Sequence, residues 1–205
     1  MALLGKASMI SVASATLASG GVYCVYQYNS GRSGVPRSFE DYKLAFFDLN
    51  GDDALWNARL EVLKNNEVTG SSELLKSAKK NPSLQSIRKA CGEFYSLKFI
   101  SNSDKDEDDF KKYCTKTNKD VLGNAWVSDF TTDVQAEKIA SKISSAGNKA
   151  ISPKLDAILK KYPDNKKNKS LAEEVSAWCK EVGESVYLGE TIDFNNSKEY
   201  CKAVQ

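Results

Sequence analysis

The chain has 205 residues, of which 27% are charged, and its formal net charge is only +2 because Lys and Arg nearly balance Asp and Glu. This balance provides no basic surface that could hold a phosphate backbone, so we predict no nucleic-acid partner. The sequence contains no His, which excludes Ser-His-Asp and Cys-His catalytic sites in their usual form and also excludes His-ligated zinc.

The first element in the chain is a charge-free segment from Ala7 to Tyr28, which follows Lys6. A helix of that length reaches roughly 33 Å, which is enough to cross a hydrocarbon core of about 30 Å. Aromatic residues typical of a membrane interface gather at its C-terminal end: Tyr23, Tyr26 and Tyr28. We therefore predict a transmembrane signal-anchor helix over residues 1–28, followed by a linker over residues 29–37. A cleaved signal peptide and a buried N-terminal helix are the alternatives.

The remainder, residues 38–205, predicts an all-α domain, because apolar residues recur at helical spacing and sustained strand-like alternation is absent from the sequence. The first predicted helix begins at Ser38 and places Tyr42, Phe46 and Leu49 on one apolar face. Three further helices are predicted to follow it, over Asp52–Asn66, Ser72–Lys80 and Ser83–Ser96. Their short connections favour antiparallel neighbours.

The helical pattern continues after a polar, acidic stretch over residues 102–109, which we predict to be a solvated loop. A short helix then carries Phe110, Tyr113 and Cys114, and residues 118–145 predict one long helix or two. The remaining predicted helices begin at three capping positions: Ser152 with Pro153, Ser170 with Glu173, and Ser197 after a connection at Asn195-Asn196.

Two similar halves are visible in the domain. The tetrapeptides KKNP at residues 79–82 and KKYP at residues 160–163 each precede a helix that carries a cysteine. A Lys-x-Tyr-Cys sequence then follows each of these helices at nearly the same distance. We therefore predict two related helical units, over about residues 38–116 and about residues 117–205.

Four cysteines lie beyond the apolar segment, in two similarly spaced pairs: Cys91 with Cys114, and Cys179 with Cys201. In an oxidising compartment these pairs predict two structural disulfides. Each bond would close a loop of about 23 residues and contribute roughly 3 kcal/mol in the loop-entropy model. Buried thiols in a reducing cytosol are the main alternative. A metal site of four cysteines is a remote one, since no pair has C-x-x-C spacing.

The sequence over Asp48–Asp53 has acidic or amide side chains at positions one, three and five of a calcium-binding loop. The glycine required at position six is Asp53, however, and the acid required at position twelve is Arg59. We interpret the segment as a helix N-terminus with favourable acids, and the acidic stretch over residues 104–109 as a solvated turn. All three tryptophans are predicted to pack in the core: Trp56, Trp126 and Trp178.

A short N-terminal segment of small apolar residues is followed by the sequence LNGDDALW at residues 49–56, by AWC at residues 177–179, and by paired YC sequences that end at Cys114 and Cys201. This combination resembles the large paralogous families of uncharacterised proteins in haemotropic mycoplasmas. The resemblance implies a wall-less bacterium, an N-terminal membrane segment and display at the cell surface, where extensive paralogy is usually discussed as antigenic variation. It implies no catalytic residues.

The predicted protein is therefore a single-pass protein of the cell membrane whose C-terminal domain lies outside the cell. There it is expected to act as a surface antigen or host-contact protein without enzymatic activity. Its expected partners are the membrane and an unidentified host or self protein, and we predict no cofactor, no metal and no catalytic residue. Two other classes stay open: a cytosol-facing membrane-anchored scaffold with free thiols, and an enzyme with an unrecognised carboxylate or Lys site.

Overall fold

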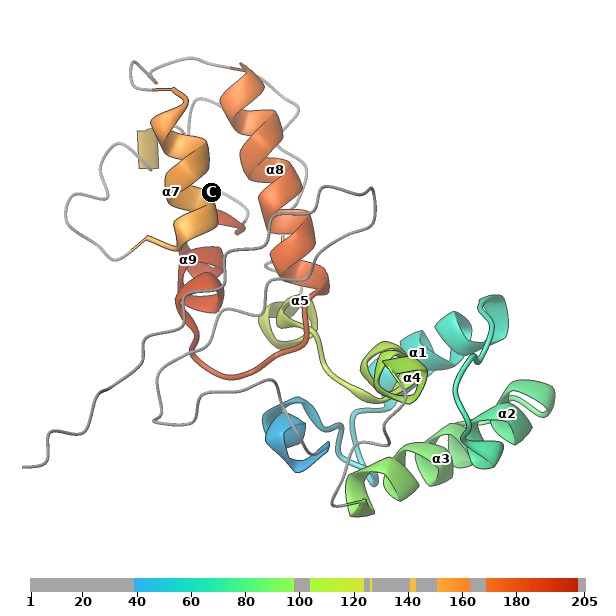
Figure 1. The fold of residues 1–205 in the computed structure, drawn as a ribbon. Coiled ribbons are helices and arrows are strands. Elements are labelled where there is room, and N and C mark those ends of the chain that lie inside the picture. Colours follow the sequence, from blue (N-terminus) through green and yellow to red (C-terminus); the bar gives the residue numbers. More distant parts are fainter. Residues whose placement is uncertain are drawn as a thin grey trace, which may run out of the picture.

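Helices account for all the regular secondary structure of the described residues in the computed structural model, which are residues 39–97, 104–123, 126, 141–142, 151–162 and 169–202. This architecture confirms the predicted all-α class (Figure 1). The helices are η1 (Phe39–Ala45, a 3₁₀ helix), α1 (Asp53–Asn65), α2 (Glu73–Lys80), α3 (Leu84–Ser96), α4 (Asp104–Cys114), α5 (Asn118–Leu122), α7 (Pro153–Lys160), α8 (Lys169–Glu184) and α9 (Ile192–Tyr200).

These helices gather around two hydrophobic cores. In Figure 1, α1 to α4 lie together in one part of the molecule and α7 to α9 in another, with α5 between them. The predicted membrane helix over residues 1–28 and the linker over residues 29–37 lie outside the described residues. Within the described part of the chain, no helix has the length and apolar character needed to cross a membrane.

The first core lies among η1 and α1 to α4 and contains a cluster of aromatic side chains. The ring centroid of Phe110 lies 4.6 Å from that of Phe39, 5.5 Å from that of Tyr42 and 5.7 Å from that of Phe94. Tilted and edge-on contacts of this kind stabilise an aromatic cluster beyond the area that it buries. Phe110 therefore brings together three helices that are separated in the sequence.

The predicted helix from Ser38 is a 3₁₀ helix, and this changes which side chains are buried. Phe39, Tyr42 and Ala45 face the core at every third position, because a 3₁₀ helix has three residues per turn. The predicted face of Tyr42, Phe46 and Leu49 is wrong at Leu49, which is 37% exposed in the turn after η1.

The second core lies among α7, α8 and α9. The predicted start of α7 is confirmed, because the hydroxyl of Ser152 accepts from the backbone N–H of Leu155 at 3.4 Å and Pro153 is the first helical residue. Helix α8 begins at Lys169 and so already includes Ser170, which was predicted to be its cap.

The predicted start of the last helix at Ser197 is wrong, because α9 begins at Ile192 and includes the expected connection at Asn195-Asn196. The cap is Thr191, whose hydroxyl accepts from the backbone N–H of Phe194 at 3.1 Å. Asn196 is buried inside α9, and its side chain accepts from the backbone N–H of Ser152 at 2.7 Å. This contact gives the Asn196 side chain a hydrogen-bond partner in a distant segment while Asn196 lies inside the helix.

The predicted solvated loop over residues 102–109 is also wrong from Asp104 onward, where α4 begins. Asp106 and Asp109 are buried and their carboxylates bond to the loop between α1 and α2. Of the two alternatives for residues 118–145, the single long helix is wrong, because α5 ends at Leu122. Gly123 follows with φ 60° and ψ −143°, a conformation that glycine adopts at least cost. Most of residues 124–145 lie outside the described residues.

Candidate functional site

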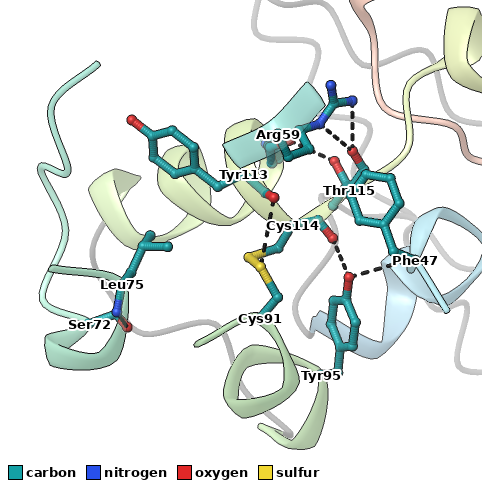
Figure 2. Close-up of a disulfide and its surroundings, with 10 residues drawn as sticks. Phe47, Arg59, Ser72, Leu75, Cys91, Tyr95, Tyr113, Cys114 and Thr115 are labelled. Carbon is teal, nitrogen blue, oxygen red and sulfur yellow. Dashed lines mark hydrogen bonds between the residues drawn. A yellow bond between two sulfur atoms is a disulfide. The ribbon is translucent and has the colours of Figure 1, made fainter. Parts of the chain in front are cut away.

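The four cysteines of the domain lie in the predicted pairs and are joined in the structure. Cys91 in α3 and Cys114 at the end of α4 have Cα atoms 5.3 Å apart (Figure 2). Cys179 in α8 and Cys201 after α9 have Cα atoms 5.6 Å apart. Both separations lie in the usual range for disulfides. All four residues are fully buried, so each bond lies inside one core, away from solvent.

Tyr95 fixes the backbone beside the first disulfide. Its hydroxyl donates to the carbonyl of Cys114 at 2.6 Å and accepts from the backbone N–H of Phe47 at 3.2 Å (Figure 2). Its ring stacks on Phe46, with the two centroids 3.9 Å apart. Burial raises the pKa of the Tyr95 hydroxyl above its usual value.

Residues 115–118, which we call the strap, follow α4 of the first core and include Asn118, the first residue of α5. Isolated antiparallel bridges join Thr115 to Phe46 and Thr117 to Val186, on the two sides of the strap. The backbone N–H of Lys116 donates to Ala45 at 2.7 Å, and its carbonyl accepts from Tyr187 at 2.9 Å. The strap is therefore hydrogen-bonded to both halves of the domain.

The second half of the domain also completes the first core. Val186 and Leu188, which follow α8, pack against the first core as partly buried side chains. The side-chain amide of Asn118 donates to the carbonyl of Val182 in α8 at 2.8 Å, and its backbone N–H donates to Ser185 at 2.9 Å. These contacts hold the C-terminal end of α8 beside the strap.

Two ion pairs flank the strap. Arg59 of α1 donates to the carbonyl of Thr115 at 3.1 Å (Figure 2). Arg59 also pairs with Asp120 of α5, and these two charged side chains are only 12% and 14% exposed. On the other side, Lys116 lies 2.7 Å from a carboxylate oxygen of Asp52. The hydrogen bond from Lys116, reinforced by the backbone N–H of Asp48, holds the pKa of Asp52 below its usual value.

The acidic side chains of the incomplete calcium-binding motif accept hydrogen bonds from the neighbouring backbone. A carboxylate oxygen of Asp48 accepts from the backbone N–H of Asn50 at 2.9 Å, and Asp52 accepts from the backbone N–H of Asp48 at 3.0 Å. The carbonyl of Asp48 accepts from the indole N–H of Trp56 at 2.8 Å. This geometry agrees with a helix start, and the described residues contain no group of three side chains suited to hold a metal.

The two ion pairs around the strap hold it and α5 to the first half of the domain. Asp52 is paired with Lys116 and Asp120 with Arg59, so both of these carboxylates have a cationic partner. A separate open depression of about 410 Å³ borders α2. It is lined by acidic and basic residues together with one apolar residue and one serine: Glu67, Val68, Glu73, Lys76, Ser77, Lys79 and Lys80. In this depression Lys76 pairs with Glu73 at 2.9 Å.

Sequence reasoning located the cysteines but missed the residues that organise the strap, which are Tyr95, Arg59 and Asp120. A local signal exists only for Asp120, which forms a capping box with Thr117. Of the three tryptophans, Trp56 and Trp178 are buried in the two cores as predicted, and Trp126 is only partly buried against the second.

The described residues define a class of structure: an all-α protein with two cores, each crossed by a disulfide and both bonded to one short strap. Comparison of the chain with protein-family models, with curated proteins and with solved structures finds no match.

Proposed function

We propose that this chain is a membrane-anchored helical protein whose domain is displayed outside the cell, where it contacts a host or self protein and performs no catalysis. The main support comes from the two buried disulfides, one in each core. Disulfides form and persist in oxidising compartments and are rare in a reducing cytosol. Two such bonds in one domain therefore support a location outside the cytosol.

The N-terminal sequence supplies the anchor. The charge-free segment from Ala7 to Tyr28 is long enough to span a bilayer as a helix. The resemblance to paralogous mycoplasma families favours a variable antigen or host-contact protein as the role of the displayed domain. A cytosol-facing scaffold would be the same chain in the opposite orientation, and its four domain cysteines would be thiols.

Trypsin applied to intact cells tests the location of the domain. The predicted linker contains Arg32 and Arg37, after which trypsin cleaves. A displayed domain is expected to leave the cell as fragments whose N-terminus is Ser33 or Ser38, identified by mass spectrometry of the medium. The control is the double variant Arg32→Gln/Arg37→Gln, for which these two N-termini are expected to disappear.

The outcomes separate the two orientations. A domain that trypsin leaves untouched on intact cells but digests after lysis would contradict display and favour the cytosol-facing scaffold. A domain found in the medium without any protease would show that the N-terminal segment is cleaved, so that the protein is exported without an anchor.

A further inference from the structure

The strap begins directly after the first disulfide. Cys114 ends α4, and the next residue, Thr115, is fully buried and bridged to Phe46. Cys91 and Tyr95 lie one turn apart on the same face of α3, and both hold Cys114, one through the disulfide and the other through the hydrogen bond to its carbonyl (Figure 2). The start of the strap is thus tied to α3 at two points.

The other end of the strap is bonded to the end of α8. Asn118 donates to Val182 with its side chain at 2.8 Å and to Ser185 with its backbone at 2.9 Å. Tyr187 donates to the carbonyl of Lys116 at 2.9 Å. A continuous series of bonds therefore runs from the Cys91–Cys114 disulfide, through the strap, to the helix that carries the second core.

The second disulfide ties different elements together. Cys179 lies inside α8 and Cys201 follows α9, where its backbone N–H donates to Ser197 at 2.8 Å, and both cysteines belong to the second core. The sequence separations within the two pairs are nearly equal, 23 and 22 residues. The two disulfides therefore close loops with nearly the same entropy cost, but they join different helices.

We propose that the Cys91–Cys114 bond, acting through the strap, fixes how the second half of the domain packs against the first, and that the Cys179–Cys201 bond does not. Without the first bond, the covalent link between Cys114 and α3 is lost and the Tyr95 hydrogen bond to the Cys114 carbonyl remains. The strap can then separate from Ala45 and from the end of α8 while both cores stay folded. Such local openings expose backbone amides to hydrogen exchange. This dependence is a property of the oxidised protein and does not require that the domain contacts a host or self protein.

Hydrogen exchange of the full chain in mild detergent, followed by mass spectrometry, tests the proposal. Three forms are compared: the oxidised wild type, the variant Cys91→Ala/Cys114→Ala, and the matched control Cys179→Ala/Cys201→Ala. Peptides over residues 115–119 and 184–189 contain the bonded N–H groups of the strap and its partners. The hydrogen-exchange rate of both peptides is expected to rise at least about tenfold in Cys91→Ala/Cys114→Ala. In the control Cys179→Ala/Cys201→Ala it is expected to rise less than about threefold.

A third variant keeps the test decisive if the first variant fails to fold, as judged by circular dichroism. Arg59→Gln leaves both disulfides intact and removes the side-chain anchor on the carbonyl of Thr115, so the exchange rate in the same two peptides is expected to rise less than about threefold. Where the first variant folds, equal exchange in the two double variants would overturn the proposal. Where it does not fold, a rise of about tenfold or more in Arg59→Gln would overturn it, because the strap would then open with the first disulfide intact.

Discussion

The ring of Trp126 rests on Gly183 of α8, a position without a side chain. A Cβ atom placed at Gly183 would lie 2.5 Å from a ring carbon of Trp126, closer than packed atoms approach one another. Gly92 in α3 provides a comparison, because a Cβ atom there would lie 3.5 Å from Leu49, an ordinary contact. The two helical glycines therefore differ in the space beside them.

We expect Gly183→Ala to lower the free energy of unfolding by about 1–3 kcal/mol through overpacking, since the ring must move. The matched control Gly92→Ala is expected to raise the same free energy by up to about 1 kcal/mol, because alanine favours a helix where space allows. Urea unfolding of the two variants measures both changes. A Gly183→Ala variant that gains as much stability as Gly92→Ala would show that Trp126 does not cover this position.

Tyr113 has a buried hydroxyl that predicts an alkaline sensitivity. The hydroxyl donates to the carbonyl of Glu67 at 2.7 Å, and burial raises the pKa of Tyr113 to about 12 from an ordinary value of 10.0. Because this pKa is raised in the folded state, the contribution of Tyr113 to stability is complete below about pH 10 and is lost as the pH rises towards 12.

The variant Tyr113→Phe lacks the titrating group and is expected to show a weaker pH dependence of its free energy of unfolding between about pH 10 and 12. At neutral pH it is expected to lose about 1 kcal/mol with the hydrogen bond. Denaturant unfolding at a series of pH values measures both effects. If the free energy of unfolding fell equally steeply with pH in the variant and the wild type, the pKa of Tyr113 would not be raised by burial.

Helix α4 and the loop between α1 and α2 depend on each other. Asp109 accepts from the backbone N–H groups of Thr69 at 2.9 Å and Gly70 at 2.6 Å. Asp106 accepts from the backbone N–H of Ser71 and, at 2.9 Å, from its hydroxyl. Two buried carboxylates thus satisfy three successive amides that a tight loop would otherwise leave unbonded.

We expect Asp109→Asn to lower the free energy of unfolding by about 1–3 kcal/mol, because the amide has one acceptor oxygen and places donors beside donors. Asp108→Asn is the matched control on the exposed side of α4, with an expected change within about 0.5 kcal/mol. Thermal or urea unfolding of both variants tests the contrast. Equal stability of the two variants would contradict the role of Asp109 in holding the loop.

Helices with local start signals could be predicted from the sequence, and helices fixed by distant contacts could not. Ser72 and Ser83 cap α2 and α3, because their hydroxyls accept from backbone N–H groups three residues later. A serine at such a position can be recognised from the sequence alone. The start of α4 was missed because its acids look solvated until the loop at residues 69–71 is placed beside them. The start of α9 was missed because the partner of Asn196 is Ser152.

The same distinction applies to the candidate site. Cysteine pairing could be predicted because each pair is close in sequence and the spacing occurs twice. The strap could not be predicted, because its partners Ala45 and Tyr187 lie far from it in the sequence, one before it and one after it. Thr115 and Lys116 themselves resemble ordinary loop residues. Arg59 carries no signal either, since its acceptor at Thr115 becomes apparent only in the folded chain.

The described residues of the domain form two cores joined by the strap, and the predicted boundary between residues 116 and 117 falls inside that strap. Val186 and Leu188 cover the first core from the second half, so the halves share apolar contacts as well as hydrogen bonds. Duplication of an ancestral unit stays a prediction.

Sequential alkylation of the protein from its own cells determines whether both disulfides exist there. Free thiols are blocked in denaturant with one reagent, the sample is reduced, and the newly released thiols are labelled with a second reagent for mass spectrometry. We expect only the second label on the four domain cysteines: Cys91, Cys114, Cys179 and Cys201. The first label on these residues would contradict a displayed, disulfide-bonded domain and would favour the cytosol-facing scaffold.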